Sequence, residues 1–148
     1  MGNTRVQLTN NASATEAEKL GQERRVKGKK IKAKVAHGKC YVKSTYNNTI
    51  VSISDLKGNV LAWGSSGVLG FKGPKRATPY AATEVVKYLL ERVRDCGIQD
   101  MDVFVRGIGG GREAAVRALA TQGINILSIK DVTPIPHNGP RPPKVRRV

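Results

Sequence analysis

The stretch Cys40-Tyr-Val-Lys-Ser-Thr-Tyr46, which Asn47-Asn48 separates from Thr49-Ile-Val-Ser-Ile-Ser54, decides the fold of this chain. Both runs are rich in β-branched and aromatic residues, and the asparagine pair between them is typical of a turn. They are therefore predicted to be two strands that pair antiparallel. A further turn leads into Val60-Leu-Ala-Trp63, so the folded part is predicted to open with a three-stranded meander.

After the meander the pattern changes to alternating helices and strands. Thr78 before Pro79 is a helix-start signal, and apolar residues at helical spacing continue to Cys96, where Gly97 is placed to end the helix. The order βββαβαβ predicts an α/β domain with a mixed five-stranded sheet and flanking helices. The later elements are expected to be a helix at 79–96, a strand at 102–106, a helix at 112–122 with Val116, Leu119 and Ala120 inward, and a strand at 125–131.

Positive charge is concentrated at the two ends of the chain. The whole sequence has 26 Lys and Arg against 11 Asp and Glu, which gives a formal charge of +15. The net charge is +6 in residues 1–38, +5 in residues 39–131 and +4 in residues 132–148. These segments are expected to be an N-terminal extension with a basic arm at 24–34, an α/β domain, and a basic, proline-rich C-terminal tail.

Both ends are expected to be disordered in the free protein. The first lacks hydrophobic periodicity, and the second is too rich in proline to form a helix or a central strand. Like-charged arms of this kind often bind polyanions, although a tail can also serve only to keep a protein in solution. Two such arms on one small domain favour a nucleic acid as the partner.

Composition and spacing argue against several other classes of protein. No apolar run is long enough to span a membrane, and the start of the chain lacks a secretory signal. Two isolated cysteines, Cys40 and Cys96, indicate neither a disulfide framework nor a zinc site, and no metal or other cofactor is expected. His37 and His137 have no nucleophile or carboxylate at a telling spacing, so the chain is not expected to be an enzyme.

A glycine-rich loop at residues 64–76 is the strongest candidate for contact with RNA. Glycines let the backbone approach a phosphate closely, and Lys72, Lys75 and Arg76 at the end of the loop would neutralise it. Trp63 and Phe71 flank the loop, where either could stack on an unpaired base or lie in the core.

The segment Gly107-x-Gly109-x-x-Arg112 only partly matches a dinucleotide-binding fingerprint, because Arg112 replaces the third glycine. The same geometry, with free N–H groups at a helix start and Arg112 and Arg117 nearby, suits a phosphate of RNA.

Taken together, these motifs resemble one known family. Tyr46-Asn-Asn-Thr-Ile-Val51, Gly70-Phe-Lys-Gly73, Ala77-Thr-Pro-Tyr-Ala-Ala82, Gly107-x-Gly-x-Gly-Arg-Glu113 and Asp131-Val-Thr-Pro-Ile-Pro-His-Asn-Gly139 are similar to those of ribosomal protein eleven of the small subunit, in its bacterial and organellar branch. The resemblance covers about residues 39–148 and leaves the leader, residues 1–23, unplaced.

The resemblance implies a structural constituent of the small ribosomal subunit that supports translation. Such a protein sits on the platform, bridges helices of the small-subunit rRNA, and helps form the cleft for the mRNA and its Shine-Dalgarno pairing. It implies small-subunit proteins seven and eighteen as neighbours, with six and twenty-one as further candidates, and a bacterial cytoplasmic ribosome with an organellar one as the alternative.

The resemblance also implies rRNA contacts at positions in the hairpin turn, the glycine-rich loop, the second helix and the tail. They are Asn47, Asn48, Gly70, Lys72, Lys75, Arg76, Arg112, Arg117, His137, Asn138, Arg141, Lys144, Arg146 and Arg147. Two competing classes are an enzyme acting on nucleic acid, which would need a metal-dependent turnover, and a regulator that binds nucleic acid away from the ribosome.

Overall fold

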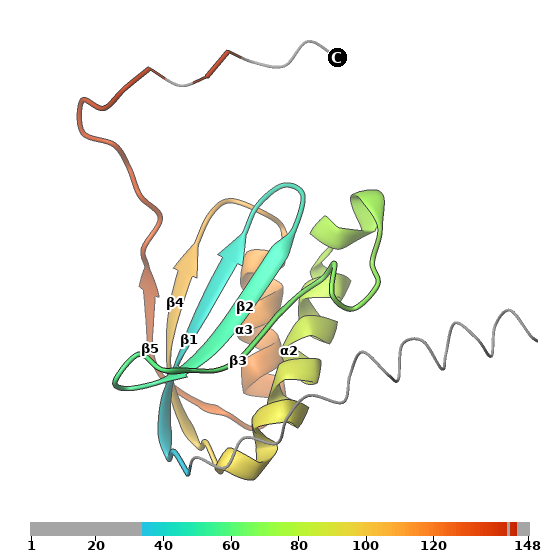
Figure 1. The fold of residues 1–148 in the computed structure, drawn as a ribbon, viewed down its shortest axis with the longest axis vertical. Coiled ribbons are helices and arrows are strands. Elements are labelled where there is room, and N and C mark those ends of the chain that lie inside the picture. The colour runs from blue at the N-terminus through green and yellow to red at the C-terminus, as the bar shows by residue number, and fades with distance from the viewer. Residues whose placement is uncertain (1–33, 142, 145–148) are drawn as a thin grey trace, which may run out of the picture.

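The computed structural model describes residues 34–141, 143 and 144, and shows a five-stranded sheet with two α-helices packed against it (Figure 1). The predicted order of strands and helices is confirmed. The predicted leader, all but the last residue of the basic arm, Arg146 and Arg147 lie outside the described residues. The elements are β1 (His37–Ser44), β2 (Thr49–Asp55), β3 (Val60–Ser65), the 3₁₀ helix η1 (Gly73–Ala77), α2 (Pro79–Val93), the 3₁₀ helix η2 (Arg94–Cys96), β4 (Asp100–Arg106), α3 (Gly111–Thr121) and β5 (Asn125–Asp131).

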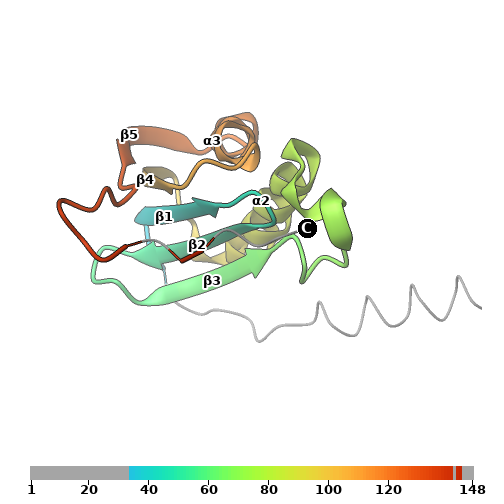
Figure 2. The same cartoon turned by 90° about the horizontal axis from the view of Figure 1, so that it is seen from above.

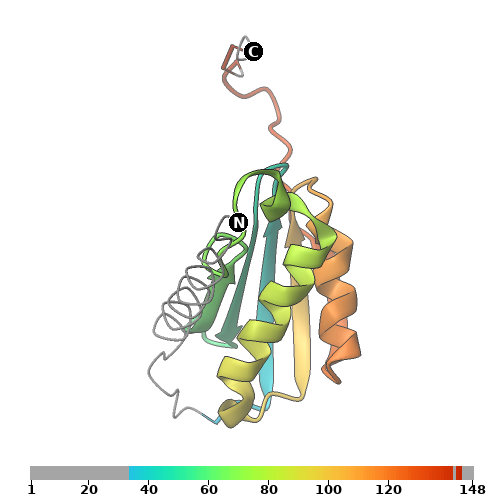
Figure 3. The same ribbon diagram turned by 90° about the vertical axis from the view of Figure 1, so that its right-hand side faces the viewer.

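The strands lie in the order β3-β2-β1-β4-β5, with β1 in the centre. The pairs β1–β2 and β2–β3 are antiparallel, whereas β1–β4 and β4–β5 are parallel, so the sheet is mixed as predicted. Each parallel strand requires a crossover connection, and α2 and α3 provide them. Both helices cover the same face of the sheet (Figure 3), which leaves the other face open in the described part of the chain.

The core lies between the sheet and these two helices. Alternate residues of β1, Cys40 and Val42, are buried against the helices, while Tyr41 and Lys43 point to the open face. The predicted inner face of the first helix is confirmed, because the apolar residues expected there are all buried. They are Ala82, Val85, Val86, Leu89, Val93 and Cys96.

The predicted inner face of the second helix is wrong at one position. Leu119 is buried and Val116 is half-buried, but Ala120 is exposed, and Ala115 and Ala118 are buried in its place. The stripe 115-118-119 keeps the spacing of three and four residues that a helix face requires. Contact with α2 rotates the buried stripe away from Ala120, and the sequence pattern alone did not reveal this rotation.

Several predicted boundaries shift by a few residues. The first helix ends at Val93 and tightens into η2, because Gly97 takes a left-handed conformation with φ of 72°. Strand β1 begins at His37 instead of Cys40, since pairing with Asp100 of β4 extends both strands. The loop predicted at 64–76 is shorter than expected, because β3 continues to Ser65 and η1 begins at Gly73.

The glycines after β4 allow two loops to touch. A Cβ atom on Gly107 would overlap with the Ser44 carbonyl oxygen, and one on Gly109 would overlap with the Thr45 carbonyl oxygen. In the native chain the Gly109 amide donates a hydrogen bond to the Ser44 carbonyl oxygen at 3.2 Å. These glycines therefore fix the β4–α3 loop against the end of β1.

Replacing Gly107 by alanine is expected to destabilise the fold by about 3 kcal/mol or more, because it adds a backbone clash to the cost of its φ of +99°. Gly58→Ala is the matched control, since Gly58 has a φ of +92° but nothing within 4 Å of its would-be Cβ. It should cost only about 1 to 2 kcal/mol. Urea unfolding of both variants measures the difference, and equal costs would contradict the proposed close packing.

Candidate nucleic-acid interface

Three loops and the start of the tail gather at one end of the sheet, which we call the loop end (Figure 1). It consists of the hairpin turn 45–48, the loop 66–78, the β4–α3 loop 107–110, and the tail from residue 132 onward. Because β1, β4 and β5 are parallel, their carboxyl ends lie at the same edge of the sheet. Figure 2 shows the molecule from above, which is the side on which the loop end lies.

The hairpin turn presents Asn47 to solvent and uses Asn48 internally. The Thr45 amide donates to the Asn48 carbonyl oxygen at 2.9 Å, and the Asn48 amide donates to the Thr45 hydroxyl at 3.1 Å. The Asn48 side chain meets Ser66 of the neighbouring loop, with 2.5 Å between the Ser66 hydroxyl and the amide oxygen. Asn48 therefore ties the hairpin to the glycine-rich loop.

The Ser66 hydroxyl is also 2.7 Å from the Arg76 carbonyl oxygen. A hydroxyl carries one proton, so it donates to one of these two oxygens at a time. Ser66 therefore lies between the Asn48 side chain and the Arg76 carbonyl and can donate to either of them. This buried serine was not singled out from the sequence, where no motif marks it.

The glycine-rich loop holds its basic side chains in different ways. Gly70 is exposed with φ of 90°, and Lys72, just before η1, and Lys75, in the middle of η1, are exposed as well. Arg76 is half-buried, and its Nε has no hydrogen-bond partner among the described residues. Lys72 and Lys75 are thus the side chains of this loop most open to a phosphate.

The two aromatic residues that flank this loop have different environments. Phe71 is half-buried and makes an edge-to-face contact with Tyr80, with 6.1 Å between ring centroids. Trp63 leaves 57% of its surface exposed, so of the two alternatives weighed for it the core position is wrong. Trp63 therefore lies on the exposed surface of β3.

Arg112 is engaged within the protein. Its Nη2 lies 2.7 Å from Asp131 Oδ2, and its Nη1 donates to the Gly107 carbonyl oxygen at 3.1 Å. Arg117 lies further along α3, with 81% of its side chain exposed and 3.6 Å from Glu113. The structure therefore brings Arg112 to the loop end and places Arg117 on the outer surface of the helix.

Asp131 fixes the first residues of the tail. The Thr133 hydroxyl donates to Asp131 Oδ1 at 2.7 Å and accepts from the Gly107 amide at 3.0 Å. The hydrogen bonds from Thr133, followed by that from Arg112, lower the pKa of Asp131 to about 2. This carboxylate is therefore ionised at neutral pH and joins β5, α3 and the tail.

Beyond Thr133 the described tail contains no helix or strand and runs away from the domain (Figure 1). His137, Asn138, Arg141 and Lys144 are exposed, and Asn138 has a positive φ of 55°. The predicted lack of regular structure is confirmed for residues 132–141, 143 and 144.

Charge is unevenly distributed over the domain. The acids at the loop end in the described residues, Asp131 and Glu113, are each paired with an arginine. Four aspartates lie at the opposite end of the sheet: Asp55, Asp95, Asp100 and Asp102. The described basic residues at or next to the loop end are Lys43, Lys72, Lys75, Arg76, Arg106, Arg112, Lys130, Arg141 and Lys144.

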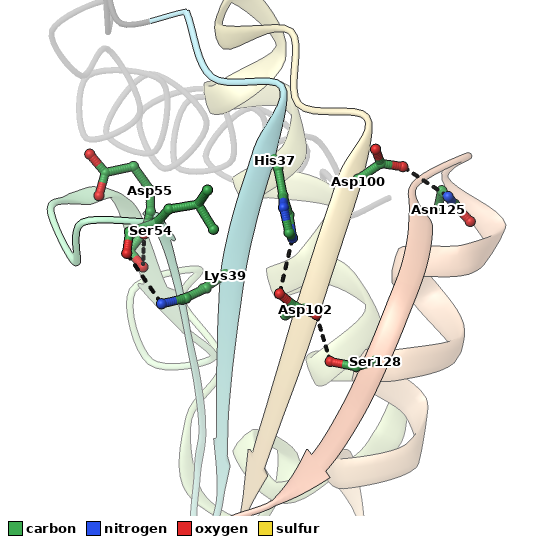
Figure 4. A network of polar contacts seen from close by, with 9 residues as sticks. His37, Lys39, Ser54, Asp55, Asp100, Asp102, Asn125 and Ser128 are labelled. Carbon is green, nitrogen blue, oxygen red and sulfur yellow. Dashed lines mark hydrogen bonds and ion pairs between the residues drawn. The ribbon is translucent and has the colours of Figure 1, made fainter.

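At the opposite end, Asp100 and Asp102 are held in a network of hydrogen bonds (Figure 4). His37 Nε2 is 3.0 Å from Asp102 Oδ2, the Ser128 hydroxyl donates to Asp102 Oδ1 at 2.5 Å, and Asn125 donates to Asp100 at 2.8 Å. The hydrogen bond from Ser128, followed by that from His37, lowers the pKa of Asp102. The concentration of acids at this end makes the loop end the more favourable place for a polyanion.

Two further classes of site receive no support from the described part of the chain. It contains no group of three His, Cys, Asp or Glu residues placed to hold a metal ion. None of its helices is long and apolar enough to cross a membrane.

Comparison with known proteins identifies the family. A family model described as Ribosomal protein S11 matches residues 38–147, which is most of the chain. The chain belongs to the ribosomal protein S11 family. It is 53% identical to the small ribosomal subunit protein uS11 of Borreliella burgdorferi over 120 residues, which cover 81% of this chain and 92% of the relative. It is 49% identical to uS11 of Treponema pallidum over 122 residues, or 82% of this chain and 97% of the relative.

The segment that matches the S11 family starts at Gly38, the second residue of β1. It includes the whole loop end and the tail up to Arg147, and therefore every position carried over as an rRNA contact. Residues 1–37 precede the matched segment, and their role is not indicated by this family.

The contacts of Asp131 predict a measurable titration. Because its pKa is about 2 instead of 3.8, ionised Asp131 stabilises the folded state above pH 3.8, and that stability is lost as the pH falls toward 2. Thr133→Val should raise the pKa toward 3.8 and flatten the stability profile between these values. Carboxyl-carbon NMR titration measures the change. Ser128→Ala is the control, since it should raise the pKa of Asp102 and leave that of Asp131 unchanged.

Proposed function

We propose that this chain is a structural constituent of the small ribosomal subunit, in which it binds and bridges helices of the small-subunit rRNA. The observation that carries the proposal is the collection of exposed basic side chains at the loop end of an S11-family domain. RNA is a polyanion, and neutralising its phosphates releases counterions, which provides much of the binding free energy.

The folded domain and the tail have different tasks in this proposal. The sheet holds the hairpin, the glycine-rich loop and the β4–α3 loop in fixed relative positions, so they can contact one RNA surface without an ordering cost. The tail leaves from the same end and carries Arg141, Lys144, Arg146 and Arg147. An extended segment of this kind can reach between phosphates of a second helix and become ordered there.

The proposed rRNA contacts fall into two groups by how freely they can act. Asn47, Gly70, Lys72, Lys75 and Arg117, with His137, Asn138, Arg141 and Lys144 of the tail, are exposed. Asn48, Arg76 and Arg112 are tied into the protein, so we assign them the task of shaping the loop end, with any contact to a phosphate made by their remaining N–H groups. Arg146 and Arg147 complete the proposed set.

The finer placement rests on the resemblance to the family. It supports a position on the platform, beside the cleft for the mRNA and its Shine-Dalgarno pairing, with small-subunit proteins seven and eighteen, and also six and twenty-one, as neighbours. The bacterial source of the relatives supports a cytoplasmic ribosome over an organellar one. In this role the chain acts as a scaffold for RNA and not as a catalyst.

Sedimentation tests the proposal most directly. A cell lysate is separated on sucrose gradients at moderate and at high salt, and each fraction is probed for the full-length chain. We expect the chain to travel with the small subunit through the salt wash, and a variant lacking residues 141–148 to be released at lower salt. Recovery of the full-length chain at the top of both gradients would contradict the proposal and favour a regulator that acts off the ribosome.

Two charge-matched double variants test the loop end. Lys72→Ala with Lys75→Ala should reduce the salt dependence of binding to purified small-subunit rRNA, by about 0.7 to 0.9 in the slope of log K against log salt for each lost phosphate contact. Lys57→Ala with Arg94→Ala removes the same charge from the opposite end and should leave the slope unchanged. Filter binding over a range of salt measures both, and equal slopes would contradict an interface at the loop end.

A further inference from the structure

The open face of the sheet carries a row of aromatic side chains that the sequence did not bring together. Pairing places Trp63 of β3 opposite Ser52 of β2, Ser52 opposite Tyr41 of β1, and Tyr41 opposite Phe104 of β4. Phe104 in turn lies opposite Lys130 of β5. One row across the sheet thus contains three aromatic rings and ends in a lysine.

Two of the three rings are exposed, and Phe104 is half-buried. Trp63 exposes 57% of its surface and Tyr41 exposes 41%, whereas an aromatic residue of a folded domain is normally mostly covered. Tyr41 and Phe104 stack with 5.1 Å between centroids and 17° between planes. A cross-strand pair of this kind stabilises a sheet, which accounts for the contact between the two rings. It does not account for Trp63, which has no aromatic contact in the described residues.

Basic side chains lie on the loop-end side of this row. Lys43 and Arg106 are paired across β1 and β4, two residues beyond Tyr41 and Phe104. Two residues along a strand span about 6.6 Å, which is close to the separation of a base from its own phosphate. Arg106 and Lys43 are exposed, and the row that they form is continuous with the loop end.

On the other side of the aromatic row the polar groups are already engaged. Lys39 donates to the Leu56 carbonyl oxygen at 3.2 Å, and Asp102 is held by His37 and Ser128 (Figure 4). The lower half of the face therefore has polar groups that are already held by other groups of the protein, and the upper half is aromatic and positively charged.

We propose that the upper half of the open sheet face binds unpaired bases of RNA, which stack on Trp63 and on the Tyr41–Phe104 pair while Lys43, Arg106 and Lys130 contact their phosphates. This inference rests on the proposed function and adds a second RNA-binding surface to the loop end. Stacking on an aromatic ring requires a base that is not enclosed in a helix, so the ligand is a loop, bulge or single strand and not a duplex.

Charge argues against the other occupants of this face. The segment that precedes β1 is strongly basic at residues 24–34, so it would be repelled by Lys43, Arg106 and Lys130. A second copy of this face would bring the same three positive charges against themselves. An RNA strand satisfies both the aromatic and the basic parts of the surface.

Trp63 is the single tryptophan of the chain, so its intrinsic fluorescence reports on this face directly. The full-length protein is titrated with two RNA probes of equal phosphate number: a single-stranded oligoribonucleotide of mixed sequence and a blunt duplex. Both probes should bind by charge, but only the single strand should quench Trp63. Quenching by both probes to the same extent, or by neither, would overturn the proposal.

Variants separate stacking from a disturbed fold. Trp63→Ala should weaken binding of the labelled single strand about 5- to 100-fold, and Trp63→Phe should retain most of the affinity. Val60→Ala is the matched control, because Val60 lies on the same edge strand with 61% of its surface exposed and should have no effect. Equal affinities for Trp63→Ala and the wild type, measured by anisotropy, would overturn the stacking surface.

The outcomes distinguish this inference from the proposed function. If the chain fails to bind either probe and does not travel with the small subunit, the proposed function fails. If it travels with the small subunit and binds RNA while Trp63 is neither quenched nor required, only the stacking surface fails. Photo-crosslinking in intact subunits that joins Trp63 to a protein and not to RNA would likewise overturn it.

Discussion

Strand β1 hydrogen-bonds to a neighbour on each of its edges, and the rest of the structure depends on that double pairing. On one side it completes an antiparallel hairpin with β2, and on the other it lies parallel to β4. The parallel pair forces the chain to cross over through α2, which covers one face and closes the core. It also brings the carboxyl ends of β1, β4 and β5 to one edge of the sheet. The hairpin turn and the loops that bear basic residues come directly after strands and therefore lie at that edge.

Close packing at that edge fixes the positions of the loops relative to one another. Gly107 and Gly109 let the β4–α3 loop rest on the end of β1, Asn48 and Ser66 join the hairpin to the glycine-rich loop, and Asp131 holds the start of the tail. Most of these contacts use backbone groups or short side chains, which leaves Lys72 and Lys75 free to point outward. The arrangement holds positive charges near one another, at a cost in repulsion that a bound polyanion would remove.

Most of the fold could be predicted from local patterns, because strand alternation, helical spacing and capping residues are written in neighbouring positions. The Thr78 cap was predicted and is present, with its hydroxyl accepting from the Ala81 amide at 3.2 Å. The left-handed Gly97 was predicted as well. Ala120 was assigned to the wrong face, since the rotation of α3 is decided by contact with α2. The glycine motif after β4 is predicted to contact a phosphate, and that stays a prediction; the structure adds that Gly107 and Gly109 allow close contact with Ser44 and Thr45.

The sequence by itself determined the order of strands and helices, the basic character of both ends and, through its motifs, the S11 family. These properties depend on single residues and on short spacings between them, so they can be recognised without the tertiary structure. Only the tertiary structure decided that four aspartates gather at the end of the sheet away from the loops, that Arg112 pairs with Asp131, and that Trp63, Tyr41 and Phe104 share one row. The physical reason is strand register: Trp63 and Phe104 lie 22 and 63 positions from Tyr41 in the sequence, and they join its row on one face only after the sheet has paired.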